Sequence, residues 1–183
     1  MSQNEVSATE LKLIDCNETE HAAAILEILN EAILNSTALY DYQPRTLQSM
    51  QSWFAIKREQ NFPVLGIVNS TGKLLGFSTW GSFRAFPAYK YTVEHSVYIH
   101  HAHRGGGLSK ILMQTLIEKA QQQQLHVLVG CIDADNTASI QLHQKLGFTH
   151  SGTIRQAGFK FGRWLDAAFY QLTLTTPLHP QDG

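Results

Sequence analysis

A run of three glycines next to an arginine is the stretch of this sequence best suited to binding chemistry. It reads Arg104-Gly105-Gly106-Gly107 and follows a segment rich in β-branched and aromatic residues, residues 92–100. Glycine lets a backbone approach a ligand closely, because it has no Cβ. Apolar residues then recur at helical spacing, at Leu108, Ile111, Leu112, Leu116 and Ile117. The pattern therefore predicts a strand, a glycine-rich turn and a long helix.

The start of the predicted helix is suited to a phosphate or a pyrophosphate. The first N–H groups of a helix have no partner within it and carry about half a unit of positive charge. Arg104 would add a permanent cation. The spacing matches neither the P-loop, GxxxxGK[ST], nor the dinucleotide motif GxGxxG, because Lys110 stands where the third glycine would be. A loop that merely joins two elements remains the alternative.

A carboxylate, Glu94, lies inside the predicted strand that leads to the glycines. Alternation along a strand separates Val93, His95, Val97 and Ile99 on one face from Glu94, Ser96 and Tyr98 on the other. An unpaired charge is unfavourable inside a strand. Glu94 is therefore either a solvent-facing or ion-paired residue, or a general base that takes a proton from an attacking amine. The sequence leaves both interpretations open.

A second polar pair, Asn136 and Ser139, stands at the start of another predicted helix. Capping of that helix is the simpler interpretation, but the run DNTASIQLHQKLGF over residues 135–148 is more specific than a cap. It resembles the signature N-x-x-S-x-x-L-[YH]-x-K-x-G-F of the GNAT acetyltransferase superfamily. Residues 104–109 resemble the pyrophosphate loop of the same superfamily, with Ser109 where Gly or Ala is usual.

Within that superfamily, the chain is similar to the phosphinothricin and methionine sulfoximine N-acetyltransferases. The similarity rests on residues 36–38 with Pro44 behind them, residues 92–99 and residues 158–166, and it extends over nearly the whole chain. It implies an α/β GNAT fold, with a central mixed, mostly antiparallel sheet flanked by helices on both faces. It also implies acetyl-coenzyme A as co-substrate, a small amino-acid analogue as acceptor, a cytoplasmic location and a homodimer. We expect a single domain over residues 1–183 with an ordered core at 10–175.

The same resemblance implies roles for individual residues. Glu94 matches the family's proposed general base. His143 could protonate the leaving thiolate or assist deprotonation, or it could be a partly buried structural histidine. Residues that would bind acetyl-coenzyme A are Val97, Tyr98 and Ile99 for the pantetheine arm, Arg104, Gly105, Gly106, Gly107, Leu108, Ser109 and Lys110 for the pyrophosphate, and Asn136 and Ser139 near the thioester. Residues that would contact the acceptor are Arg84, Ala85, Phe86, Glu94, His95 and Ser96.

Two other functions stay open at this point. The protein could acetylate another amine, such as a polyamine or a protein N-terminus, or it could bind acetyl-coenzyme A without catalysis. Arg84 argues against a polycation, because a guanidinium is suited to grip the carboxylate of an amino acid. Glu94 and His143 argue against a binding module, because such a module needs no groups that transfer protons.

Composition excludes several other classes of protein. The 183 residues are 43% hydrophobic and carry a net charge of −1 without a basic stripe, which argues against a nucleic-acid partner. No apolar run approaches the ~20 residues of a membrane span. Cys16 and Cys131 lie far apart, and we expect reduced thiols. We expect no metal, because no Cys or carboxylate cluster completes a ligand set with His95, His100, His101 and His103.

The remaining elements are predicted from periodicity and turn residues. We expect a helix from an N-cap at Thr19 to about Asn35, with a frayed N-terminus (Met1–Thr9) and a disordered tail at 176–183. Candidate buried positions of a second helix, at 46–60, are Leu47, Met50, Phe54 and Ile56. Further strands are expected at 11–15, 63–68, 73–82, 127–133, 148–157 and 161–174, with Gly158 at the last bend, and a further helix at 136–146, ended by Gly147.

Overall fold

A computed structural model describes residues 10–182 of the chain. Its helices and longer strands are, in chain order, β1 (Lys12–Asp15), α1 (Glu18–Asn35), α2 (Leu47–Glu59), β2 (Val64–Val68), β3 (Leu74–Ser82), β4 (Thr92–Ile99), α3 (Leu108–Gln122), β5 (Val127–Asp133), α4 (Thr137–Lys145), β6 (Thr149–Lys160) and β7 (Arg163–Thr173). Short 3-10 turns lie at Pro87–Tyr89 and His101–His103. Among these described helices, none has the length and apolar character that a membrane crossing needs.

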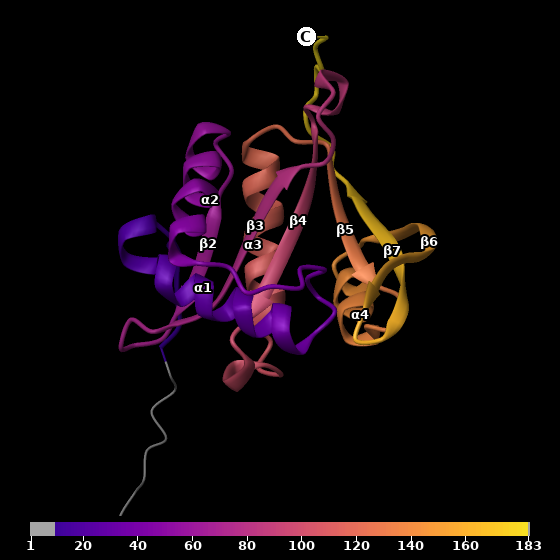
Figure 1. The fold of residues 1–183 in the computed structure, drawn as a ribbon. Coiled ribbons are helices and arrows are strands. Elements are labelled where there is room, and N and C mark those ends of the chain that lie inside the picture. Colours follow the sequence, from indigo (N-terminus) through magenta and orange to yellow (C-terminus); the bar gives the residue numbers. More distant parts are fainter. Residues whose placement is uncertain (1–9, 183) are drawn as a thin grey trace, which may run out of the picture.

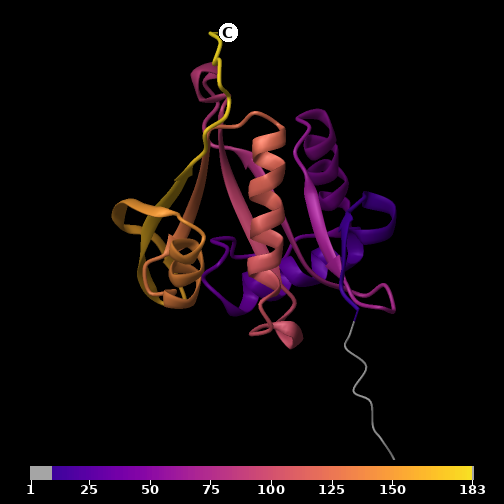
Figure 2. The same ribbon diagram turned by 180° about the vertical axis from the view of Figure 1, so that it is seen from behind.

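Within residues 10–182, seven strands form one mixed sheet in the order β1-β2-β3-β4-β5-β7-β6. β4 and β5 pair in parallel, and the other neighbours pair antiparallel. Parallel neighbours need a crossover, and α3 supplies it. α1 and α2 cover one face of the sheet (Figure 1), and α3 crosses the other face (Figure 2). The predicted α/β class with helices on both faces is confirmed.

β4 and β5 separate soon after they meet. Their pairing runs from Thr92 with Val127 to Glu94 with Val129, where it ends. Beyond that point the two strands diverge (Figure 1), and β5 continues its pairing with β7 as far as Asp133. The sheet therefore opens into a V directly beside Glu94.

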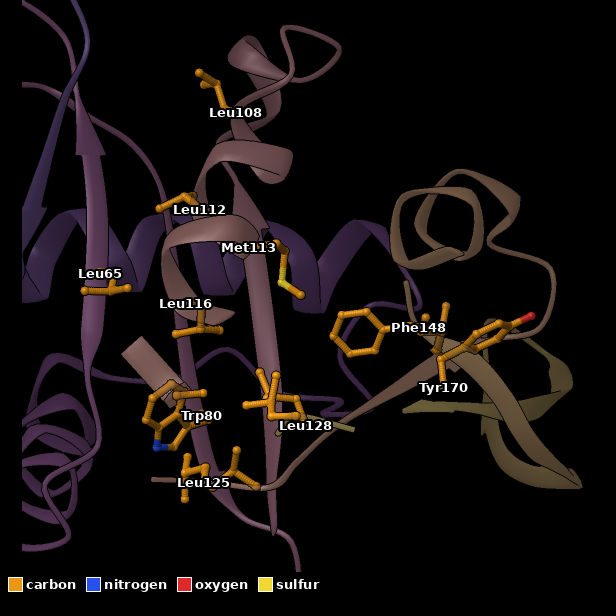
Figure 3. Close-up of a cluster of buried hydrophobic side chains, with 14 of the residues drawn as sticks. Leu65, Trp80, Leu108, Leu112, Met113, Leu116, Leu125, Leu128, Phe148 and Tyr170 are labelled. Atoms are coloured by element: carbon orange, nitrogen blue, oxygen red, sulfur yellow. The ribbon is translucent and has the colours of Figure 1, made fainter. Parts of the chain in front are cut away.

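Two apolar cores lie on the two faces of the sheet. In Figure 3, Leu112 and Leu116 of α3 lie with Trp80 and Leu128 in one core. Ile25, Leu29, Phe54 and Phe77 belong to the other core, between α1, α2 and the sheet. Along β4, Val93, Val97 and Ile99 pack in the first core and Tyr98 packs against the second. The alternation predicted for this strand is confirmed, so Glu94 and Ser96 face the α1 side.

Helix details differ from the sequence predictions in three places. The N-cap of α1 is Asn17, whose side chain accepts from the Glu20 N–H, and not Thr19. In α2 the buried face runs through Met50 and Phe54, whereas Ile56 is exposed, because it stands two residues, about 200°, round the helix from Phe54. Leu47, the first residue of α2, is also exposed.

The C-terminal part also departs from prediction. Gly158 lies inside β6, and the hairpin turns at Phe161-Gly162, whose φ angles are 51° and 73°. Positive φ at both central residues is typical of the tight turns that join antiparallel strands. The tail expected to be disordered contacts the domain: the His126 ring donates to the Thr176 carbonyl at 2.8 Å, and the Gln181 N–H donates to the Tyr91 hydroxyl at 3.0 Å. The prediction for Met1–Thr9 lies outside the described residues.

Candidate active site

A pocket of about 320 Å³ opens where β4 and β5 diverge. Four parts of the chain line it: the segment after α1, the strands β4 and β5, and the first turns of α4. Its lining residues include Tyr40, Glu94, Cys131, Asn136 and His143. The pocket therefore brings together both predicted catalytic residues and one end of the predicted cofactor site.

Glu94 is half-buried at the edge of this pocket. Burial raises the pKa of its carboxyl group, and the charge of Arg84 acts in the opposite direction. In residues 10–182, Glu94 takes part in none of the ion pairs that the structure contains. The sequence left two interpretations of Glu94 open, a solvent-facing or ion-paired residue and a general base. A half-buried carboxyl group with a raised pKa and no ion pair in the described residues favours the general base.

His143 and His95 form a buried pair, with their Nε2 atoms 2.8 Å apart. The Nδ1 of His143 donates to the Ser139 carbonyl at 2.7 Å, so in a neutral ring its Nε2 accepts a hydrogen bond from the Nε2–H of His95. Burial lowers the pKa of both imidazoles, so both rings are neutral near pH 7. His95 lies on the opposite face of β4 from Glu94, yet both histidines border the pocket because β4 and β5 separate there.

Gly130 of β5, which the sequence analysis did not single out, makes room for this pair. A Cβ at Gly130 would lie 3.0 Å from His95 Cε1 and 3.1 Å from His143 Nε2. A larger residue would displace one or both imidazoles from this position, because contacts this short are tight for a Cβ. The glycine has no local sequence signal, since the requirement arises from side chains on two other elements.

The triple glycine forms an open loop at the start of α3. Gly105 and Gly107 have φ angles of +84° and +78°, in the left-handed region that glycine adopts without strain. No atom of residues 10–182 lies within 4 Å of where a Cβ at Gly105 or Gly107 would stand. Gly107 is the N-cap and has no side chain to satisfy the first N–H groups of α3. These backbone donors therefore remain suited to a pyrophosphate.

The other residues predicted for the pyrophosphate have different environments. The guanidinium of Arg104 pairs with Glu31 of α1, and its Nε donates to the Ile99 carbonyl at 3.2 Å. The side chain of Leu108 is buried in the core, so its backbone alone can face a ligand. Ser109 is half-buried and Lys110 is exposed. Arg104 thus ties the loop to α1, and Glu31 offsets its charge.

Within residues 10–182, the edge of β4 that faces β5 has no strand beside it along Val97, Tyr98 and Ile99, although the Ile99 carbonyl already accepts from Arg104 Nε. On its other side the strand pairs with β3, through Ser78, Phe77 and Gly76 respectively. The β4–β5 pairing ends before these residues, at Glu94 with Val129. An extended ligand can therefore pair with this edge as an added strand.

Asn136 and Ser139 act as a cap and also border the pocket. The Asn136 side chain accepts from the Ser139 N–H at 3.1 Å, which confirms the capping interpretation. Both residues line the pocket beside His143. Capping and a ligand contact are compatible here, because an amide side chain can donate while its oxygen accepts.

Arg84, Ala85 and Phe86 form an exposed loop after β3. The Arg84 guanidinium donates to the Phe83 carbonyl at 2.7 Å, and it lies close enough to Glu94 and Cys131 to lower the pKa of both groups. Phe86 is 72% exposed. Within the described residues, none of the three lines the 320 Å³ pocket. The structure places Arg84 near the site and leaves Phe86 outside it.

Lys160 holds the pocket wall formed by residues 37–40, a role that sequence reasoning missed. Its ammonium group, on a residue only 4% exposed, donates to the carbonyls of Ile33, Ser36 and Leu39 at 2.6, 2.8 and 2.6 Å. Gly158 lets the Tyr40 ring approach β6, because a Cβ there would lie 2.8 Å from that ring. β6 therefore positions the segment after α1 that completes the pocket.

Both cysteines are free, as expected. Cys131 lines the pocket, which the sequence gave no reason to expect. Burial, reinforced by the charge of Glu94, raises the pKa of its thiol to about 11. Cys131 is therefore a neutral thiol near pH 7 and a poor nucleophile.

Comparisons with known proteins show which family this chain is similar to. The sequence model described as "Acetyltransferase (GNAT) family" matches residues 24–148. The L-methionine sulfoximine/L-methionine sulfone acetyltransferase of Pseudomonas aeruginosa is 46% identical over 150 residues, which are 82% of this chain and 87% of that protein.

Solved structures are similar over almost the whole chain. An acetyltransferase-family structure from Acinetobacter baylyi ADP1 shares 71% identity with a TM-score of 0.96, covering 97% of this chain and 99% of that one. A phosphinothricin acetyltransferase from Sinorhizobium meliloti, in complex with acetyl-coenzyme A, shares 29% identity with a TM-score of 0.89, covering 94% and 93%. The chain thus belongs to the GNAT family of acetyltransferases, as its two sequence motifs predicted.

Proposed function

We propose that this acetyltransferase moves the acetyl group of acetyl-coenzyme A to the α-amino group of a small amino acid or amino-acid analogue. The names of its relatives support acceptors of the methionine sulfoximine, methionine sulfone or phosphinothricin type. Glu94 carries the proposal: its half-buried carboxyl group, which has no ion-pair partner among the described residues, borders the pocket at the point where β4 and β5 part. A cytoplasmic location and a homodimer belong to the same proposal.

The residues of this chain fit the acetyl donor. The space around Gly105 and Gly107 is open, and the first N–H groups of α3 would bind the pyrophosphate. The open edge of β4 at residues 97–99 would pair with the pantetheine arm. Asn136 would lie near the thioester, since it borders the same pocket as Glu94.

The chemistry follows from these positions. Acetyl-coenzyme A supplies a thioester carbonyl. An amino acid is protonated at its amine near pH 7, so Glu94 takes a proton from the amine, directly or through a water molecule. The amine then attacks the thioester carbonyl carbon, and a backbone N–H in the region of Val97 and Tyr98 stabilises the oxyanion that forms. When the oxyanion collapses, the C–S bond breaks, coenzyme A leaves as a thiolate, and the nitrogen loses the second proton that the amide does not keep.

The departing thiolate needs a proton, and we propose His143 as one source. Its Nε2 already accepts a hydrogen bond from His95. This role therefore requires that the bond between the two imidazoles opens or passes a proton along. The alternative of a structural histidine predicts that His143→Gln leaves turnover nearly unchanged once folding is confirmed.

A thiol-release assay tests the function. Purified protein and acetyl-coenzyme A are combined with methionine sulfoximine, methionine sulfone, phosphinothricin, the common amino acids, spermidine and a short peptide with a free N-terminus. A higher rate of thiol release with the amino acids or analogues than with spermidine or the peptide supports the proposal. A preference for spermidine or the peptide would show that the acceptor is a polyamine or a protein N-terminus and not an amino acid. Tight binding of acetyl-coenzyme A without turnover of any amine would indicate a binding module.

A further inference from the structure

A second cavity, of about 270 Å³, adjoins the active-site pocket on the α1 and α2 side of the sheet. Leu39, Glu94, Ser96 and Tyr98 line both spaces. The remaining walls come chiefly from α2 and β3, which contribute Trp53, Lys57, Phe77, Thr79 and Gly81. A molecule whose amine lies at Glu94 can therefore extend from the first space into the second.

Gly81 leaves this second cavity open beside Glu94. The two residues are direct partners across β3 and β4. Along β3, Gly81 stands two residues after Thr79 and four after Phe77, so a side chain at position 81 would point to the same face of the sheet as theirs. In the described part of the chain, no atom lies within 4 Å of where that Cβ would stand, and the φ angle of Gly81 is not in the left-handed region. The backbone does not require glycine here, so its effect is to keep the space empty.

Lys57 places a buried ammonium group in the wall of the cavity. The residue is 9% exposed, and among residues 10–182 its one hydrogen-bond acceptor is the Trp80 carbonyl. An ammonium group has three N–H donors, so two have no hydrogen-bond acceptor in the described residues, although the group also lies 5.1 Å from the centroid of the Trp53 ring and 5.6 Å from that of Phe62. Burial, and secondarily the charge of Arg45, lowers the pKa of Lys57 to about 8, which leaves it mostly protonated near pH 7. Arg45 itself pairs with Asp41 at 2.8 Å.

We propose that this cavity receives the side chain of the acceptor amino acid and that Lys57 binds an oxygen atom at its end. The inference rests on the proposed function, because the amine must lie at Glu94. Trp53 and Phe77 would contact the methylene groups, and Lys57 would donate a charge-assisted hydrogen bond to a sulfone, sulfoximine or phosphinate oxygen. A side chain that ends in an ammonium group would be repelled by Lys57.

The first test compares two acceptors of similar length, methionine sulfone and norleucine, of which only the sulfone has side-chain oxygens. The wild-type enzyme should prefer the sulfone in kcat/KM. Lys57→Met should reduce that preference by about tenfold or more, because a charge-assisted hydrogen bond is lost, with most of the change in the KM for the sulfone. Arg58→Met is the matched control: Arg58 is the next residue of α2, pairs with Glu18 and does not line this cavity, so the preference should not change.

A series of three variants at Gly81 covers the case in which Lys57→Met does not fold. Gly81→Ala, Gly81→Val and Gly81→Leu add side chains of increasing size to open space. The KM for methionine sulfone should rise with that size, by about tenfold or more for Leu, while the acetyl-coenzyme A dissociation constant stays the same.

The outcomes separate the two proposals. No thiol release by the wild-type enzyme with any amino acid would refute the proposed function. Turnover of amino acids with no preference for the sulfone, with a preference that Lys57→Met does not alter, or with a KM that does not grow with the size of residue 81, would refute this subsite alone.

Discussion

The donor side and the acceptor side that we propose for the active-site pocket are built in different ways. The donor side consists of backbone groups from one continuous stretch, the open edge of β4 followed by the glycine loop and the start of α3. The acceptor side consists of side chains from α2, β3, β4 and the segment after α1. Backbone sites depend on local conformation, whereas side-chain sites depend on which distant elements meet. The two sides should therefore respond to different substitutions, and separately.

The largest effect is expected at Glu94, where the two sides meet. Glu94→Gln should lower kcat by about 10²-fold or more, because the general base is lost, and leave the acetyl-coenzyme A dissociation constant unchanged. In the wild-type enzyme, kcat/KM should fall as the pH drops through the raised pKa of Glu94, since the base must be deprotonated. Glu118→Gln, in an exposed glutamate of α3, is the control. Unchanged turnover in Glu94→Gln would remove Glu94 from this role.

Arg84→Ala should weaken binding of the acceptor amino acid and leave the affinity for acetyl-coenzyme A unchanged. The KM for the amino acid should rise by about 20-fold, as expected when a carboxylate loses a guanidinium partner. Arg84 lowers the pKa of Glu94, so its removal should also move the acidic limb of the kcat/KM profile to higher pH. Lys90→Ala removes another exposed cation of the same loop and should do neither. A KM that stays constant would exclude the carboxylate contact.

Gly107→Ala should weaken binding of acetyl-coenzyme A and leave the KM for the acceptor unchanged. The φ angle of +78° strains any residue with a Cβ, by about 1–2 kcal/mol, and the methyl group would stand on the ligand-facing loop. We expect the acetyl-coenzyme A dissociation constant to rise by about tenfold. Gly72→Ala is a matched control with a φ of +80° in the turn before β3, equally open. It should lose similar stability without any change in affinity, and an equal loss of affinity in both variants would contradict the prediction.

Lys160→Met should give the smallest change in kinetics and a clear change in stability. Three carbonyl groups would lose their ammonium donor, and the free energy of unfolding should fall by about 2–3 kcal/mol, measured by urea denaturation. The KM for the acceptor should rise about fivefold, because residues 37–40 line its pocket, with the dissociation constant of acetyl-coenzyme A unchanged. Lys145→Met, at an exposed lysine at the end of α4, should alter neither quantity. Equal losses for both substrates would show that Lys160 serves stability only.

The contrast between the two sides also explains what the sequence could predict. The glycine loop, the alternation of β4 and the Asn136 cap are local patterns, and the structure confirms their conformations. Glu94 could be named as a candidate base because its family motif is local too. The geometry of Arg104 could not be anticipated, because its partner Glu31 is 73 residues away in the chain.

The errors on the acceptor side have the same origin. Gly158 looked like a turn residue, yet its role is to admit the Tyr40 ring against β6, while the turn falls at Phe161-Gly162. The sequence analysis assigned no role to Lys57 or Lys160, because no local pattern shows that these two lysines are buried. Hydrophobic periodicity predicts which face of a helix or strand is buried. It does not predict which polar group of another element contacts that face.

Because β4 and β5 pair over only three residues each, the sheet has a gap between these two strands. Past Glu94 and Val129, the peptide groups of β4 on that edge have no strand of residues 10–182 beside them. A substrate arm lying along this edge would act as the missing strand and join the two halves of the sheet. Donor binding should then slow amide hydrogen exchange at residues 97–99 and raise the melting temperature. The enzyme would be most rigid when it is ready for the acceptor, which gives the fold a physical basis for ordered binding.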